Sequence, residues 1–312
     1  MKNVHKLTEG ALLLAAYTVL VLITVYLPII GMVSNLFLAV PFILFAAKNT
    51  KLNSFVFFIA AVILSVIVGS VFALPLTLSY GLTGLVIGYF IQTGKSRSAA
   101  YLASTLVFLV TLLLQYAVAA VLFNMNIIKE LMSSVRESFD MSKNMLESLG
   151  QNVDEQIWEQ FDAMFQTIET LMPSLFVLTA LFAVFLIEIV SLPIVKRFGV
   201  TVSRWGPFRE LVLPRSILWY YLITIISSFA FKPEEGSYWY IALVNLGFIL
   251  QMLMVLQGLS FIFYYSFKKG LSKAIPVIAL VLTFIIPFFL SIVRILGIID
   301  LGFDLRKRME KS

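Results

Sequence analysis

Glu188 is the residue whose type and position most clearly suggest chemistry in this chain, because it is the only acid that reads as lying well inside an apolar run. A carboxylate inside a membrane-spanning segment is costly to bury and is usually functional. Glu188 also lies two helical turns from Lys196 and Arg197. The alternative is therefore a side chain that simply reaches toward the membrane interface, and the sequence leaves both interpretations open.

The residue types on which most enzymes and metal sites depend are nearly absent. The chain has no cysteine, which excludes disulfides, thiolate metal sites and thiol nucleophiles. Its single histidine, His5, lies in the polar N-terminal tail, so zinc chemistry and Ser/His/Asp catalysis have almost nothing to build on. The turn GKSRS at 94–98 lacks the upstream glycine spacing of a nucleotide-binding P-loop. We expect no enzyme activity, no metal and no cofactor.

Four polar side chains are candidates for binding a small solute. Asn35, Tyr80 and Gln115 come near the outer ends of the second, fourth and fifth apolar runs, and Glu188 lies in the sixth. A few polar groups on an apolar wall are typical of ligand sites. The sequence therefore predicts a shallow, outward-facing pocket for a small metabolite. Gln257, in the eighth run, is interpreted instead as a hydrogen-bonding contact between helices.

Two groups of small residues could allow helices to approach closely. Ala11 and Ala15 form a small-xxx-small pair in the first apolar run, and Gly81, Gly84 and Gly88 form a similar row in the fourth. Small residues four apart on a helix favour close packing in membranes. For the alanine pair the alternatives are packing within this chain and docking of a partner subunit. For the glycine row we favour internal packing.

The composition places these residues in a membrane protein. Hydrophobic residues make up 60% of the chain and charged residues 13%, with a mean hydropathy of +0.98. Soluble domains are about half apolar and roughly a quarter charged. Because roughly 20 helical residues cross the hydrocarbon core of a bilayer, we expect an all-α, polytopic transmembrane helical bundle of about eight or nine spans. The first predicted apolar run ends near residue 26. The other eight cover 35–47, 54–72, 76–92, 99–123, 171–194, 217–231, 238–267 and 274–293.

The net charge of +6 indicates an orientation in the membrane. The basic residues fall in short turns between apolar runs, as in a positive-inside topology, so the N-terminus is predicted to be cytoplasmic in a multi-pass cell-membrane protein. Nucleic-acid binding would instead need a basic stripe with interleaved aromatic residues. No such stripe is present in the sequence.

The last apolar run gives two conflicting signals. As one helix over 274–293 it would carry the C-terminus outside, yet the tail LRKRMEK is basic, which indicates the inside. A re-entrant hairpin broken at Pro287 would satisfy both signals if protein covered its bent backbone. Both alternatives stay open, with nine crossings favoured.

Residues 124–170 differ from the rest of the chain, with nine acidic residues and only three basic ones. Apolar residues recur at helical spacing from Ile128 to Phe139 and again from Ile157 to Ile168, and Gly150 and Asn152 separate the two series. The pattern predicts an extracellular, amphipathic helical hairpin that continues into a spanning helix at each end. It is interpreted either as a coiled extension that buries its own stripe or as a lid over an outward-facing cavity.

The segments LTEGALLLAA, VPFILFAAK and LGIIDLGFDLRKR carry a resemblance to known families. Nearly the full length resembles the YybS family, uncharacterised bacterial membrane proteins of Bacillus and relatives. Residues 8 to 195 also resemble the substrate-binding S-component of energy-coupling factor vitamin transporters. This second resemblance implies a six-helix membrane core (1–123 and 171–197), with 124–170 as an insert and 198–312 as additional helices. It also implies that Ala11 and Ala15 dock onto a coupling subunit.

Two functions follow as hypotheses. In the first, the chain binds a small metabolite from outside and relies on separate ATP-driven coupling subunits, since it contains no nucleotide-hydrolysing motif. In the second, it is a non-transporting membrane scaffold or regulator that binds a partner through the acidic hairpin. Both place the lipid bilayer around the chain, and neither involves nucleic acid.

Overall fold

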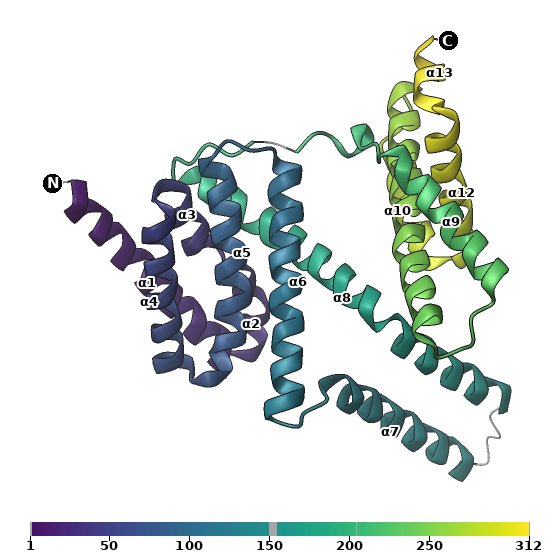
Figure 1. The fold of residues 1–312 in the computed structure, drawn as a ribbon, viewed down its shortest axis with the longest axis horizontal. Coiled ribbons are helices and arrows are strands. Elements are labelled where there is room, and N and C mark those ends of the chain that lie inside the picture. Colours follow the sequence, from purple (N-terminus) through teal and green to yellow (C-terminus); the bar gives the residue numbers. More distant parts are fainter. Residues whose placement is uncertain (1, 150–154, 204, 312) are drawn as a thin grey trace. The chain divides into compact units, whose positions relative to one another are not determined.

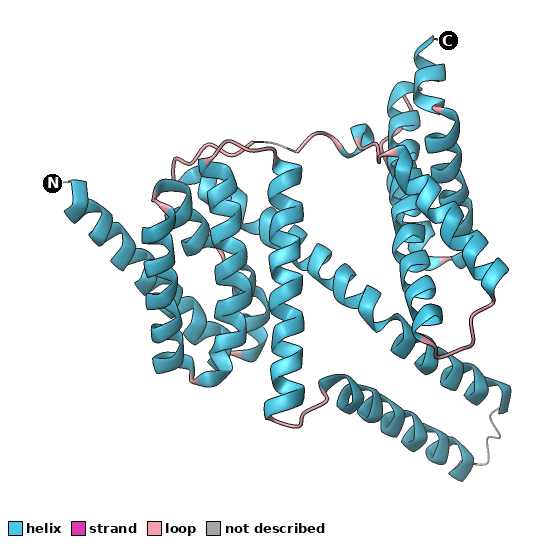
Figure 2. Cartoon of the chain, viewed as in Figure 1, coloured by secondary structure: helices cyan, strands magenta, loops and turns pink. Residues whose placement is uncertain are grey.

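The computed structural model describes residues 2–149, 155–203 and 205–311 and is built from helices joined by turns and loops (Figures 1 and 2). Within these ranges no β-strand occurs, which confirms the predicted all-α fold class. The helices are α1 (Lys2–Tyr26), α2 (Pro28–Ser34), α3 (Val40–Lys48), α4 (Lys51–Gly69), α5 (Leu74–Gln92), α6 (Arg97–Leu122), α7 (Ile127–Ser148), α8 (Glu155–Arg197), α9 (Arg215–Phe231), α10 (Tyr238–Lys268), α11 (Ala274–Ile285), α12 (Pro287–Phe303) and α13 (Leu305–Lys311).

Polar caps fix where several helices begin. The side chains of Thr50, Ser96, Asn126 and Ser237 accept a hydrogen bond from a backbone N–H in the first turn of α4, α6, α7 and α10. Such caps satisfy N–H groups that have no partner inside the helix. The turns before α4 and α6 are also basic, so the apolar segments start directly after charged or polar sequence, as the hydropathy pattern indicated.

Seven helical segments of the described chain are long and apolar enough to cross a bilayer. The bent pair of α11 and α12 adds an eighth if it is one span, and α9 is a shorter apolar helix of 17 residues. Each of the nine predicted apolar runs therefore corresponds to a helix or a broken helix. The polytopic helical membrane fold is confirmed.

The last apolar run has the break that one of the two alternatives required. The axes of α11 and α12 differ in direction by 118°, and the break falls at Ile286, just before Pro287. Proline has no backbone N–H to continue the ladder of α11, but it fits the first position of a new helix. The segment is therefore two short helices and not one straight span.

By its internal contacts the chain forms two compact units, one of residues 1–153 and 176–205 and one of residues 154–175 and 206–312. In the first unit α3 is the central element, since every residue from 40 to 46 is buried. The Phe42 ring meets the rings of Tyr17 and Phe57 edge-on, with centroids 4.9 and 5.5 Å apart. A helix of only nine residues thus carries the centre of the N-terminal core.

Helix α5 packs against α3 through its glycine row. A β-carbon on Gly84 would lie 2.8 Å from the carbonyl oxygen of Ala39, and one on Gly88 would lie 2.7 Å from that of Ile43. These distances leave no room for a side chain. The interpretation of the glycine row as internal packing is confirmed.

In the second unit α10 packs along α12 at an equally close distance. A β-carbon on Gly258 would overlap the carbonyl oxygen of Val293, and one on Gly297 would overlap that of Met254. Leu218 and Tyr221 of α9 join Met254 and Leu301 in a buried apolar cluster beside this contact. Asp304, with a left-handed φ of 50°, then ends α12 and lets the chain turn into α13.

The acidic segment differs from the prediction at one end. Helix α8 runs without interruption from 155 to 197, as expected, but α6 ends at Leu122 and α7 begins only at Ile127. The expected continuity of α6 with the hairpin is wrong, because Asn124 adopts a left-handed φ of 51° and Asn126 caps a new helix. The predicted turn at Gly150 and Asn152 lies outside the described residues. The extracellular side and the domain boundaries stay predictions.

Candidate functional site

Glu188 lies on α8 in the N-terminal unit and is only 1% exposed. Its Oε2 atom accepts hydrogen bonds from Nε of Arg97 and from Nε1 of Trp205, both at 3.2 Å. Its Oε1 atom is buried and accepts no hydrogen bond within the described residues. One oxygen of this carboxylate is therefore hydrogen-bonded within the protein, and the other can still accept a hydrogen bond.

Arg97 is placed by the cap of α6, since it is the first residue of that helix after Ser96. Its Nη1 atom donates to the carbonyl oxygen of Ser203 at 3.2 Å, and its guanidinium carbon lies 5.0 Å from the centre of the Trp205 ring. The same indole packs edge-on against Tyr101, with ring centroids 5.6 Å apart. The loop after α8 is thus tied to the start of α6 around the buried carboxylate.

A cavity of about 350 Å³ opens beside this ion pair. Glu188 and Arg97 line it together with Lys95 and the hydroxyl-bearing residues Thr201 and Ser203, and the remaining wall is largely apolar. Pockets that bind small molecules commonly have volumes of roughly 300–1,000 Å³ and a few convergent polar groups. This cavity can accept a ligand that offers a hydrogen-bond donor to Glu188 and a negative group to Lys95.

The structure separates the four predicted solute-binding residues. Tyr80 faces Asn35, whose buried Oδ1 accepts no hydrogen bond within the described residues. Gln115 donates to the hydroxyl of Ser79 at 2.9 Å, so it lies beside the part of α5 that carries Tyr80. On α6, however, Gln115 comes 18 residues after Arg97, about 27 Å along the axis at 1.5 Å per residue. Glu188, which binds Arg97, lies at the other end of this bundle.

The alanine pair lies on an exposed face of α1. Ala11 and Ala15 are both exposed, whereas Tyr17 and Val21 on the opposite face are fully buried. The Tyr17 hydroxyl donates to Thr77 at 2.6 Å and holds α1 against α5. The small-residue patch is therefore not covered by the N-terminal unit itself.

Comparisons with known proteins supply the family. Residues 15–301 match a family described as "Predicted membrane protein (DUF2232)". This chain belongs to that family. It is also 31% identical over 315 residues to "Uncharacterized protein YybS" of Bacillus subtilis (strain 168), with 99% of this chain and 100% of the relative covered. No solved structure matches the chain. The predicted resemblance to YybS is confirmed, whereas the S-component resemblance stays a prediction.

This DUF2232 protein has a second buried carboxylate, Asp300, which the sequence pattern did not predict. Asp300 on α12 is 4% exposed, so the interpretation of Glu188 as the only acid inside an apolar run is wrong. The last apolar run was predicted to end near 293, whereas α12 continues to Phe303. A signal was present, since Arg306 follows Asp300 by six residues and offers an opposite charge near the chain end.

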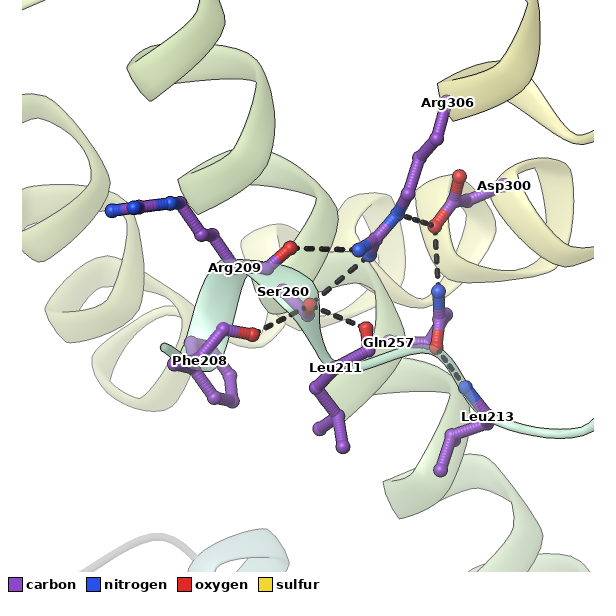
Figure 3. A network of polar contacts seen from close by, with 8 residues as sticks. All are labelled: Phe208, Arg209, Leu211, Leu213, Gln257, Ser260, Asp300 and Arg306. Carbon is purple, nitrogen blue, oxygen red and sulfur yellow. Dashed lines mark hydrogen bonds and ion pairs between the residues drawn. The ribbon is translucent and has the colours of Figure 1, made fainter. Parts of the chain in front are cut away.

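Asp300 is the centre of a polar network in the C-terminal unit (Figure 3). Its Oδ2 atom accepts from Nε2 of Gln257 at 2.6 Å and from Nε of Arg306 at 3.0 Å. Gln257 in turn accepts from the backbone N–H of Leu213 at 2.9 Å. The interpretation of Gln257 as a contact between helices is confirmed, because it joins α10 to α12.

Arg306 connects this network to the chain before α9. Its Nη1 donates to the carbonyl oxygen of Arg209 at 2.7 Å, and its Nη2 donates to the hydroxyl of Ser260 at 3.0 Å (Figure 3). Ser260 also bonds the carbonyl oxygens of Phe208 and Leu211. The Arg306 guanidinium donates to a carboxylate, a backbone carbonyl and a hydroxyl, so we assign this network to holding the fold. Among the described residues no group of three or more His, Asp or Glu side chains could hold a metal ion.

Proposed function

We propose that this DUF2232 membrane protein binds a small polar metabolite in the Glu188 cavity of its N-terminal unit. The observation that carries the proposal is a carboxylate that is 1% exposed, lines a cavity and has one oxygen that accepts no hydrogen bond from the described part of the chain. A buried acceptor without a partner costs free energy that a bound ligand can recover. Lys95 at the cavity would hold a negatively charged part of the same ligand.

The proposal includes solute entry from outside the cell, in the manner of an S-component. Asn35, Tyr80 and Gln115 lie toward the end of the bundle that the charge pattern predicts to be extracellular, and Glu188 lies toward the predicted cytoplasmic end. Two separate polar positions suit a solute that enters at one end and leaves at the other. Energy would come from a separate ATP-driven partner.

Solute binding is tested by native mass spectrometry of the protein extracted from its own membrane. We expect wild type to carry a small-molecule adduct and Glu188→Gln to lose it by at least about tenfold, because a hydrogen bond to a charged group is worth roughly 1.5–3 kcal/mol. Thr201→Trp, on the loop that lines the cavity, should also remove the adduct by filling the space.

Ser98→Trp is the matched control for Thr201→Trp, since Ser98 is exposed and does not line the cavity. It should carry the adduct as wild type does. Wild-type protein without any adduct, or an adduct that survives Thr201→Trp, would contradict binding in this cavity.

Docking of a partner through α1 is the second part of the proposal. Ala11→Trp with Ala15→Trp should lower co-purification of the ATP-driven coupling subunits by at least about tenfold, because indoles prevent the close helix approach that small residues permit. The control is Ile63→Trp with Ile67→Trp, an exposed pair at the same spacing on α4 (55% and 72% exposed). Equal co-purification with both double variants would exclude the α1 face.

A scaffold that binds a partner through the acidic segment is the second candidate. Helix α7 favours it, because Leu131, Val135, Met141 and Met145 are more than half exposed on a helix that also carries seven charged residues. In the same co-purification experiment, Leu131→Glu with Val135→Glu should remove the partner and leave the small-molecule adduct unchanged. If the protein binds a solute, Glu188→Gln should instead remove the small-molecule adduct and leave co-purification of the partner unchanged.

A further inference from the structure

We propose that a hollow at the end of α10, in the C-terminal unit, binds the headgroup of an anionic phospholipid. The hollow has a volume of about 490 Å³ and lies between the single helical turn Phe208–Glu210, the last two turns of α10 and the start of α11. Aromatic and aliphatic side chains form most of its wall, including Phe208, Phe267 and Val277. Two cationic residues, Arg209 and Lys273, complete the lining.

The two cations are available to a ligand. The Arg209 guanidinium carbon lies 3.7 Å from the centre of the Phe267 ring, which holds its charge at the apolar wall. Lys273 is exposed directly before α11. Within the described residues neither side chain pairs with a carboxylate, and Glu210, the acid next to Arg209, is not part of the lining. The hollow therefore has an uncompensated positive charge.

The position of the hollow favours a lipid over a soluble anion as its ligand. Helix α10 is a 31-residue apolar segment that ends at Lys268, so the hollow lies where a spanning helix leaves the hydrocarbon. Anionic headgroups concentrate at this depth, and basic pockets there bind them. A free phosphate would use only the two cations, whereas a phospholipid also covers the apolar wall with its glycerol and upper acyl carbons. This site is independent of the Glu188 cavity.

The experiment uses full-length protein, delipidated in a neutral detergent and titrated with dioleoylphosphatidylglycerol or dioleoylphosphatidylcholine under native mass spectrometry. We expect wild type to bind phosphatidylglycerol at least about tenfold more tightly than phosphatidylcholine, since each nearby cation contributes roughly 1 kcal/mol to attraction of anionic lipid. Arg209→Gln with Lys273→Gln should abolish this preference. Lys273→Gln alone, which changes only an exposed side chain, should reduce it severalfold.

The control is Lys269→Gln with Arg308→Gln, which removes two exposed cations that do not line the hollow. It should keep the wild-type preference. Equal losses in both double variants would mean that general surface charge attracts the lipid, and an unchanged Lys273→Gln variant would exclude the hollow. Full displacement of phosphatidylglycerol by millimolar inorganic phosphate would indicate a phosphate site and overturn lipid recognition.

Discussion

Replacing Arg306 with methionine is expected to lower the free energy of unfolding of the C-terminal unit by about 3–5 kcal/mol, the usual cost of removing one partner of a buried ion pair. The substitution removes the charged partner of Asp300, which is 4% exposed, and leaves it the neutral donor Gln257. It also removes the donors to Ser260 and to the carbonyl oxygen of Arg209. Thermal unfolding of purified protein in detergent measures the effect.

Arg308→Met is the control for this experiment, because Arg308 lies two residues further on and is exposed. It should unfold at the wild-type temperature. The double variant Arg306→Met with Asp300→Leu should regain a large part of the lost stability, since replacing a whole buried pair by apolar groups is often nearly neutral. If Arg306→Met and Arg308→Met unfolded alike, the network would not contribute as we describe.

Gly297→Ala is expected to be as damaging although it adds only one methyl group. The new β-carbon would overlap the carbonyl oxygen of Met254 in α10, and the reciprocal position, Gly258, meets the carbonyl of Val293 in the same way. Backbone cannot yield as a flexible side chain does, so α10 and α12 must move apart and expose their buried contacts. We expect a loss of about 3 kcal/mol, at the upper end of the range for overpacked cores.

Gly302→Ala, on the same helix, is the matched control. A β-carbon there would come no closer than 3.6 Å to Leu218, an ordinary contact. Because alanine favours a helix over glycine by up to about 1 kcal/mol, this variant should unfold at or above the wild-type temperature. Equal destabilisation by the two alanines would show that close helix approach at Gly297 is not the cause.

Much of the fold could be predicted because lipid-facing helices follow directly from long apolar runs. The break before Pro287 was also predictable, since proline both ends one helix and suits the start of the next. The break after Leu122 was not, because it depends on Asn124 and Asn126 taking conformations that their residue types permit but do not require. The length of α12 was also underestimated, because burial of Asp300 in this helix depends on two partners distant in the sequence or beyond the helix, Gln257 and Arg306.

The candidate site was predicted less well, because its contacts join distant parts of the chain. Glu188 was recognised from its apolar surroundings, but its partner Arg97 lies 91 residues earlier. One signal was available: Glu188 lies close to Lys196 and Arg197, and Arg97 belongs to a basic turn with the same predicted side. The prediction grouped Glu188 with Gln115 instead, although Gln115 lies 18 residues after Arg97, the partner of Glu188, on the same long helix.

The contacts of the C-terminal tail also restrict the membrane topology that this chain can adopt. Arg306 bonds the carbonyl oxygen of Arg209, Asp304 pairs with Arg215, and Lys268 bonds the carbonyl oxygen of Met309. The segments before α9, after α10 and after α12 therefore lie on the same side of the bilayer. The chain must then cross the bilayer an even number of times between one of these segments and the next. The 118° bend between α11 and α12 meets this parity, because a path that folds back on itself returns to the face it left.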